Sequence, residues 1–248
     1  MRAIRLLKLF GGEQAAWSLN ELVRAAGLNK TTAFRLLTAL ESEALIERTE
    51  NGQYQLGAEM VALGGCAMRH NSLRQVAQQS LESLVNETGE RTTLEQPVVN
   101  ADGSRAMLVL MEIQGRHLIS INQFIGSRLP MHATSTGKAY LAFVPEEERE
   151  IVLQQHLTSI TQHTITDAAQ LQEELAQIRK RGYAVALGEL EVGLMAAGAV
   201  VRNHTGAPIA TVSIEGPDTR INESKLHELG QNLVQVAQQI SFRLGYRD

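Results

Sequence analysis

The stretch LNKTTAFRLLTAL, Leu28–Leu40, decides the fold that the sequence predicts for the N-terminal part of this chain. At 3.6 residues per turn it forms an amphipathic helix whose apolar stripe is Ala33, Leu36, Leu37 and Leu40. The opposite stripe holds Thr31, Thr32, Arg35 and Thr38. An ordinary solvated face more often carries Glu and Lys, which have higher helix propensity than Thr. Short hydroxyl side chains with one arginine suit close approach to a polyanion; a solvated face of unusual composition is the alternative.

The segments on either side of this helix predict a winged helix-turn-helix. Ser18-Leu19-Asn20-Glu21 is a capping box that begins a preceding helix, and Gly27 ends it. Asn29 can cap the helix that follows. Asn51-Gly52 lies between two strand-like runs and predicts a tight hairpin. Since the second helix of such a pair enters the major groove N-terminus first, the threonine and arginine face is expected to meet a DNA duplex.

Charge and composition permit this interpretation without requiring it. The 248 residues are 44% hydrophobic and 20% charged, a globular balance with room for two modest domains. The net charge is −4, yet residues 1–40 hold six basic and two acidic side chains. A small basic patch on an acidic body is compatible with nucleic-acid binding. No apolar run approaches the length of a membrane span, no signal peptide is predicted, and the single cysteine, Cys66, fits a reducing cytoplasm.

The remaining chain mixes helices and strands. Residues 58–71 predict a joining helix weakened by Gly64-Gly65, and residues 73–87 a second amphipathic helix. Further helices are expected over 135–143, 145–156, 167–181 and 222–244. Strands are expected over 105–113, 117–123, 183–187, 194–202 and 207–215. This order predicts an α+β layer fold with a mostly antiparallel sheet.

One catalytic pattern has to be weighed. Ser135-Thr136-Gly137-Lys138 matches S-x-x-K, in which a lysine one turn after a serine can take its proton. The companion Ser-Asp-Asn motif of that enzyme class is absent, so an enzyme using Ser135 and Lys138 is the alternative rather than the main prediction. The seven histidines show no metal-ligand spacing, and neither a metal nor a cofactor is expected.

The chain resembles IclR-family bacterial transcription regulators along nearly its full length. The resemblance rests on LNKTTAFRLLTALESEALIER with YQLG, on GSRLPMHATSTGKAYLAF, and on RGYAVALGELEVGL and ATVSIEGP. It implies a winged helix-turn-helix in residues 1–57, a linker helix in 58–72, and a GAF-like effector-binding and oligomerisation domain in 73–248. It further implies a homodimer or tetramer that binds an operator, more often as a repressor, and responds to a small organic effector.

The resemblance also assigns residues. DNA contact would fall on Lys30, Thr31, Thr32, Phe34 and Arg35. The effector cavity would be lined by Leu118, Ile121, Leu129, Ser135, Thr136, Leu194, Ala196, Ser213 and Glu215. Members that bind small keto acids carry an acidic residue, Cys and Ser where this chain has Ala186, Ala196 and Glu215, so the sequence argues against a glyoxylate- or pyruvate-like effector.

Glu215 raises a further question. A carboxylate in a partly dry cavity needs a partner, because an unpaired buried charge is costly. Lys138 or Arg202 could supply that partner; otherwise the ligand does, and then it should offer a hydroxyl or ammonium donor, as a polyol, sugar, phenol or amine would. The main prediction is thus a cytoplasmic, ligand-responsive DNA-binding regulator. A sensor whose winged helix binds protein is a third, weaker alternative, opposed by the basic N-terminal residues.

Overall fold

The computed structural model describes residues 2–12, 14–116 and 124–247. By its internal contacts the chain divides into two compact units, Met1–Asn71 and Ser72–Asp248. The sequence analysis divided the chain into a DNA-binding domain (1–57), a linker helix (58–72) and an effector-binding and oligomerisation domain (73–248). That assignment of roles stays a prediction. The expected strand over 117–123 lies outside the described residues.

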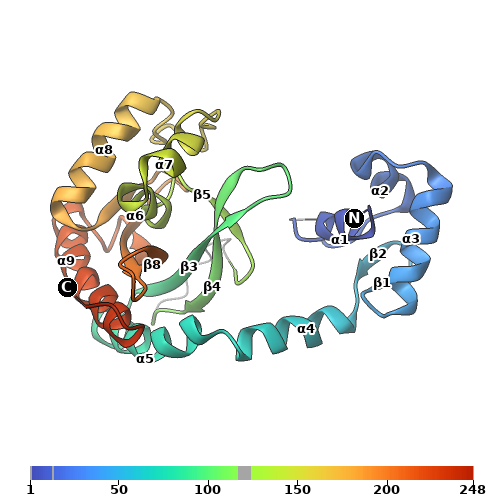
Figure 1. The fold of residues 1–248 in the computed structure, drawn as a ribbon, viewed down its shortest axis with the longest axis horizontal. Coiled ribbons are helices and arrows are strands. Elements are labelled where there is room, and N and C mark those ends of the chain that lie inside the picture. Colours follow the sequence, from blue (N-terminus) through green and yellow to red (C-terminus); the bar gives the residue numbers. More distant parts are fainter. Residues whose placement is uncertain (1, 13, 117–123, 248) are drawn as a thin grey trace. The chain divides into compact units, whose positions relative to one another are not determined.

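The first unit contains the helices and hairpin that the sequence predicts. Its elements are α1 (Arg2–Leu9), α2 (Leu19–Ala26), α3 (Lys30–Ser42), β1 (Ile46–Arg48), β2 (Tyr54–Leu56) and α4 (Ala58–Arg69) (Figure 1). Both halves of the capping box form: Ser18 Oγ accepts from the Glu21 amide, and the Ser18 amide donates to Glu21 Oε2 over 2.7 Å. Gly27 adopts φ +63° and Gly52 φ +73°, the left-handed backbone that each turn requires.

A small core holds α1, α2, α3 and the hairpin together. It is built around Leu6, Leu22, Leu37, Ile46 and Tyr54, all nearly fully buried. The first helix contributes Leu6 and Phe10, and the hairpin is extended by backbone pairing between Trp17 and Tyr54. The expected weakness at Gly64-Gly65 does not interrupt α4, which runs unbroken and has no buried residue of its own within this chain.

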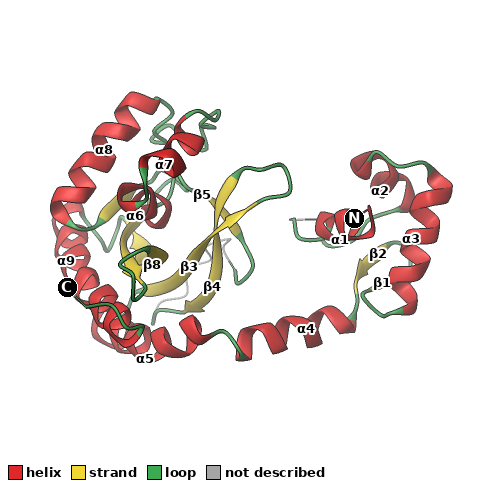
Figure 2. Cartoon of the chain, viewed as in Figure 1, coloured by secondary structure: helices red, strands yellow, loops and turns green. Residues whose placement is uncertain are grey.

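Within the described residues, the second unit is a six-stranded sheet between two layers of helices. Its strands are β3 (Arg91–Val99), β4 (Arg105–Ile113), β5 (Arg128–Pro130), β6 (Ala184–Leu187), β7 (Leu194–Arg202) and β8 (Pro208–Pro217). They lie in the order β5-β4-β3-β8-β7-β6, and every pairing is antiparallel. The α+β prediction is confirmed, although β3 and β5 were not expected as strands. Figure 2 shows the sheet between its helices.

Each helix layer covers its own face of the sheet. On one face lie α5 (Ser72–Thr88) and α9 (Glu223–Arg243), packed on Leu94, Val212 and Ile214. On the other face lie α6 (Ser135–Phe143), α7 (Glu146–Leu153) and α8 (Ala168–Arg181). Because side chains alternate along a strand, Thr93, Glu95, Ser213 and Glu215 point toward the α6 side. Polar residues of two central strands are therefore buried beneath α6.

The start of α6 rests almost directly on β7. A Cβ added to Gly198 would lie 2.6 Å from the carbonyl carbon and oxygen of Ser135. Gly137 is likewise pressed against the backbone of Met131. No side chain larger than hydrogen fits at either position without movement of the helix.

We expect Gly198→Ala to destabilise the protein by about 1–3 kcal/mol, because α6 must shift to relieve the overlap. The measurement is urea unfolding followed by circular dichroism. Gly11→Ala is the control, since its added Cβ would meet only Lys8 O at 3.5 Å, an ordinary contact. Equal stability of Gly198→Ala and the wild type would contradict the close contact described here.

Candidate functional site

The first candidate surface is the outward face of α3. Asn29 Oδ1 accepts from the Thr32 amide over 2.8 Å and so fixes the start of the helix. Ala33 and Leu37 are fully buried, while Lys30, Thr31 and Arg35 are exposed and Phe34 is 46% exposed. Thr32 is half-buried. Four of the five predicted DNA-contacting side chains thus lie on an open face, and the fifth lies at its margin.

The basic residues of this unit are available to a ligand. Among the described residues of this unit, six exposed cations make no ion pair with a described partner: Arg2, Arg5, Lys8, Arg24, Lys30 and Arg35. Arg48 differs, because it pairs with Glu41 over 3.1 Å and lies over the ring of Tyr54. Positive charge is therefore uncompensated on the helices and compensated at the hairpin.

The second candidate site is a cavity beneath the N-terminus of α6. Its lining residues are Glu95, Leu129, Ala133, Thr134, Ser135, Thr136, Ala186, Leu190, Leu194, Ala196 and Glu215. The space open to the centre of a water molecule is about 20 Å³, room for about one water. A ligand of several heavy atoms therefore enters only if the lining moves.

Six of the nine residues predicted for the effector cavity line this space. Ser213 is not among the lining residues, but its hydroxyl donates to Glu215 Oε1, which lines the cavity. Leu118 and Ile121 fall outside the described residues. The sequence prediction missed Glu95, Ala133, Thr134, Ala186 and Leu190. Strand alternation could have signalled Glu95, which is two residues from Thr93 on one face of β3, but β3 itself was not recognised.

Glu215 has an internal partner that the sequence analysis did not consider. Arg91 Nη1 donates to Glu215 Oε2 over 3.0 Å, and the two residues lie directly opposite each other on β3 and β8. Lys138 instead pairs with Glu189 over 2.5 Å, and Arg202 donates to the Gly206 carbonyl. Both partners expected for Glu215 were wrong, because neither strand pairing nor the path of the Lys138 side chain can be read from spacing.

Glu95 is the other buried carboxyl group of the cavity, and no cation among the described residues is in direct contact with it. It is 1% exposed; Thr136 Oγ1 donates to its Oε2 over 2.6 Å, and Thr93 Oγ1 lies 2.9 Å from its Oε1. Burial raises the pKa of Glu95 to about 7, and the nearby Glu215 carboxylate adds to the shift. Burial also raises the pKa of Glu215, while Arg91 opposes that change.

The arrangement does not suit a serine nucleophile. A lysine that acts as a general base must be in its neutral amine form and within hydrogen-bond reach of the serine. Lys138 is 1% exposed and its ammonium group is bound to the Glu189 carboxylate, and no hydrogen bond joins it to Ser135.

Among the described residues no group of three or more His, Cys, Asp or Glu side chains could hold a metal ion. No helix in the described part of the chain is long and apolar enough to cross a membrane.

Two family models match the sequence. The model described as Bacterial transcriptional regulator IclR C-terminal matches residues 66–242, and the IclR helix-turn-helix domain matches residues 1–50. The chain belongs to the IclR family.

Relatives of this IclR-family chain are similar along its whole length. It is 30% identical to the transcriptional repressor IclR of Escherichia coli (strain K12), over 98% of this chain and 89% of that protein. It is 32% identical to the HTH-type transcriptional regulator KipR of Bacillus subtilis (strain 168), over 99% of this chain and 96% of that protein. These proteins are named as transcriptional regulators, and this IclR-family member is a DNA-binding transcriptional regulator rather than an enzyme.

Solved IclR-family structures have the same fold. The Thermotoga maritima IclR structure matches with a TM-score of 0.75 and 29% identity, covering 99% of this chain and 98% of that one. An IclR homolog from Microbacterium hydrocarbonoxydans, complexed with 4-hydroxybenzoate, matches with a TM-score of 0.81 and 28% identity, covering 98% and 97%.

The raised pKa of Glu95 predicts a pH-dependent effect of Glu95→Gln. The folded wild type holds the Glu95 proton up to about pH 7, whereas the unfolded chain releases it near the ordinary value of 4.5. Wild-type stability therefore falls as the pH rises between these values, and glutamine avoids that loss. We expect Glu95→Gln to match the wild type near pH 4 and to exceed it by about 3 kcal/mol at pH 8.

Urea unfolding of both proteins across this pH range measures the difference. Glu146→Gln, at an exposed position in the first turn of α7, is the control and should show no such trend. A difference between Glu95→Gln and the wild type that does not change with pH would contradict the assignment.

Proposed function

We propose that this IclR-family regulator binds operator DNA through the outward face of α3 and that a small organic effector in the cavity beneath α6 controls operator affinity. The observation that carries the DNA half is the exposed, unpaired Lys30 and Arg35 on the second helix of a winged helix-turn-helix. Thr31 and Thr32 keep the face shallow, and the Phe34 ring can meet a thymine methyl or a sugar. Several relatives are named repressors, which supports repression as the mode of action.

The cavity supports the effector half of the proposal. Leu129, Leu190 and Leu194 offer apolar contact, and carboxyl and hydroxyl groups offer directional hydrogen bonds. Ser135 and Thr136 begin α6, whose first amide groups favour a carbonyl or anionic group of a ligand. The Microbacterium homolog that binds 4-hydroxybenzoate supports a small organic effector for this chain. Entry of such a molecule into so small a space would displace the lining and give the effector a structural effect.

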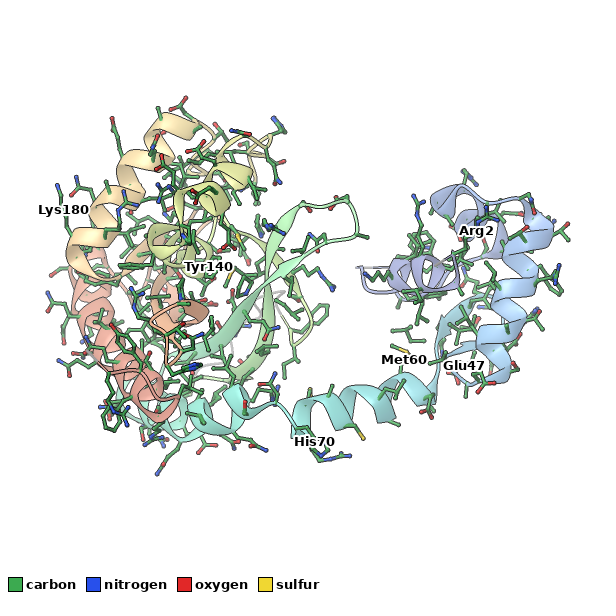
Figure 3. The ribbon with its side chains drawn as sticks, viewed as in Figure 1. Arg2, Glu47, Met60, His70, Tyr140 and Lys180 are labelled. Atoms are coloured by element: carbon green, nitrogen blue, oxygen red, sulfur yellow. The ribbon has the colours of Figure 1, made fainter. Side chains whose placement is uncertain are left out.

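Arg35→Ala should weaken operator binding by about 1–3 kcal/mol if the guanidinium contacts a guanine edge. Lys30→Ala should weaken binding to all sequences about equally and flatten the salt dependence. The measurement is a gel shift at several salt concentrations on a fragment selected from genomic DNA by the purified protein. Lys180→Ala, on the outer side of α8 (Figure 3), removes one charge elsewhere and is the control. Unchanged binding by both N-terminal variants would refute this docking.

The exposed apolar side chains of α4 support a homodimer, or a tetramer built from dimers. Val61, Leu63 and Met68 are 77%, 51% and 39% exposed. Val61 and Met68 share one helix face with Gly64 and Gly65, which would let a second helix approach closely. Two copies related by a two-fold axis would present two α3 helices to a palindromic operator.

We expect Val61→Glu to reduce the oligomer to smaller species at micromolar concentration, since two carboxylates would be buried at the seam. Analytical ultracentrifugation without DNA measures the outcome. Ile151→Glu makes the same kind of change at an exposed apolar position on α7 and should leave the mass unaltered. A wild-type monomer under these conditions would overturn the dimer proposal.

A further inference from the structure

A chain of four side-chain oxygen atoms joins Glu95 and Glu215, the two glutamates that line the cavity. Glu95 Oε1 lies 2.9 Å from Thr93 Oγ1, which lies 2.8 Å from Ser213 Oγ. Ser213 Oγ in turn lies 2.8 Å from Glu215 Oε1. Strand pairing fixes this chain, because Thr93 is directly opposite Ser213 and Arg91 is directly opposite Glu215.

The chain holds three hydrogen-bond contacts but only two hydroxyl protons. Each of Thr93 and Ser213 can donate one hydrogen bond, and a hydrogen bond needs one proton between its two oxygens. If both glutamates were ionised, one of the three short contacts would join two oxygens with no proton between them. The third proton must therefore come from a carboxyl group, and all four side chains are buried.

The surroundings decide which carboxyl carries that proton. Arg91 holds Glu215 over 3.0 Å and also reaches Glu112 over 3.3 Å, which favours the ionised form of Glu215. Glu95 has no such partner among the residues that the structure describes, and its raised pKa of about 7 agrees with a protonated group. The hydrogen bonds then run in one direction, from Glu95 to Thr93 to Ser213 to Glu215.

Other charged groups on the neighbouring elements are engaged elsewhere. On α6, Lys138 is bound by Glu189 and Tyr140 donates to Glu148. On β4, Arg105 lies at the far end of the strand, opposite Val99. The helix α5 covers the other face of the sheet. Two carboxyl groups, and no cation, thus occur among the described residues that line the cavity.

We propose that the effector of this cavity is a small amine, and that its ammonium group binds between Glu95 and Glu215 in place of the Glu95 proton. This inference rests on the proposed effector function. In the empty protein the proton keeps a carboxyl group neutral inside a site that already holds more acidic than basic side chains. An ammonium group brings one positive charge and at least two donors to the same oxygens. As it binds, the O–H bond of Glu95 breaks and the proton leaves to solvent, so charge and atoms balance.

The proton on Glu95 is tested without any ligand. The carboxyl carbons of the full-length protein are labelled with ¹³C on glutamate and followed by NMR from pH 5 to pH 9, with Glu95→Gln to assign the signal. We expect Glu95 to titrate near pH 7 and Glu215 to remain ionised at pH 7. Titration of Glu95 near its ordinary value would overturn the proton count.

The ligand class is tested with two sets of matched probes: benzylamine, benzyl alcohol and benzoate, and isobutylamine, isobutanol and isobutyrate. Calorimetry on the wild type should give amine binding that strengthens about tenfold from pH 6 to pH 8, because binding releases a proton held with a pKa near 7. Calorimetry in two buffers of different ionisation enthalpy counts that proton. Binding of a carboxylate would take up a proton and weaken over the same range.

Glu95→Gln keeps a donor toward Thr93 but cannot ionise, so it should fold and lose at least tenfold in amine affinity. Glu146→Gln is the control and should bind as the wild type does. Amine binding without pH dependence, amine binding unchanged in Glu95→Gln, or binding only of the acids or alcohols would each overturn the amine assignment, as would failure of every amine to bind. Operator binding is measured separately by gel shift. If the regulator proposal fails, the wild type does not bind operator DNA, whatever the amine results are; if only the amine proposal fails, operator binding is still observed.

Discussion

The contact between the first residues of α6 and Gly198 on β7 is the constraint on which the effector-binding unit depends. A backbone carbonyl of the helix lies where any other residue would carry its Cβ. This contact holds the N-terminus of α6 over the central strands and leaves only a narrow space beneath it. Any ligand that enters must act on the helix that covers it. Tight packing therefore makes the cavity small and also makes it a site from which movement could be transmitted.

The helix that makes this contact also covers a cluster of buried charged residues that includes Arg91, Glu95 and Glu215. Arg91 forms ion pairs with both Glu215 and Glu112, so one cation serves two carboxylates. Burying an ionised group without a partner is unfavourable, and protonation of the carboxylate removes that charge. The alternation of hydroxyl and carboxyl side chains on β3 and β8 gives that proton a defined path. The protonation of the cavity carboxyl groups therefore depends on the pairing of β3 with β8 and not on one residue alone.

The DNA-binding unit follows simpler rules. Its helix ends are fixed by local hydrogen bonds from Ser18, Glu21 and Asn29, and its hairpin turns at Gly52. A core of a few large apolar side chains then sets the outward face of α3. The exposed apolar residues of α4 do not belong to that core. They therefore do not stabilise the unit by packing within it, and they are the side chains that the proposed dimer would use.

The sequence by itself determined the elements whose signals are local. Periodicity and capping predicted α2, α3, α6, α8 and α9 with ends close to those observed, because a helix end depends on residues within one turn. The family motifs determined the two-part organisation and six residues of the cavity. Tertiary structure decided what depends on pairing between distant segments. Arg91 and Glu215 are 124 residues apart and become partners only through the β3–β8 register. Glu95 became part of the site for the same reason, since the environment of a buried carboxyl group is set by the strands and helix that close over it, and the linear sequence does not specify which ones these are.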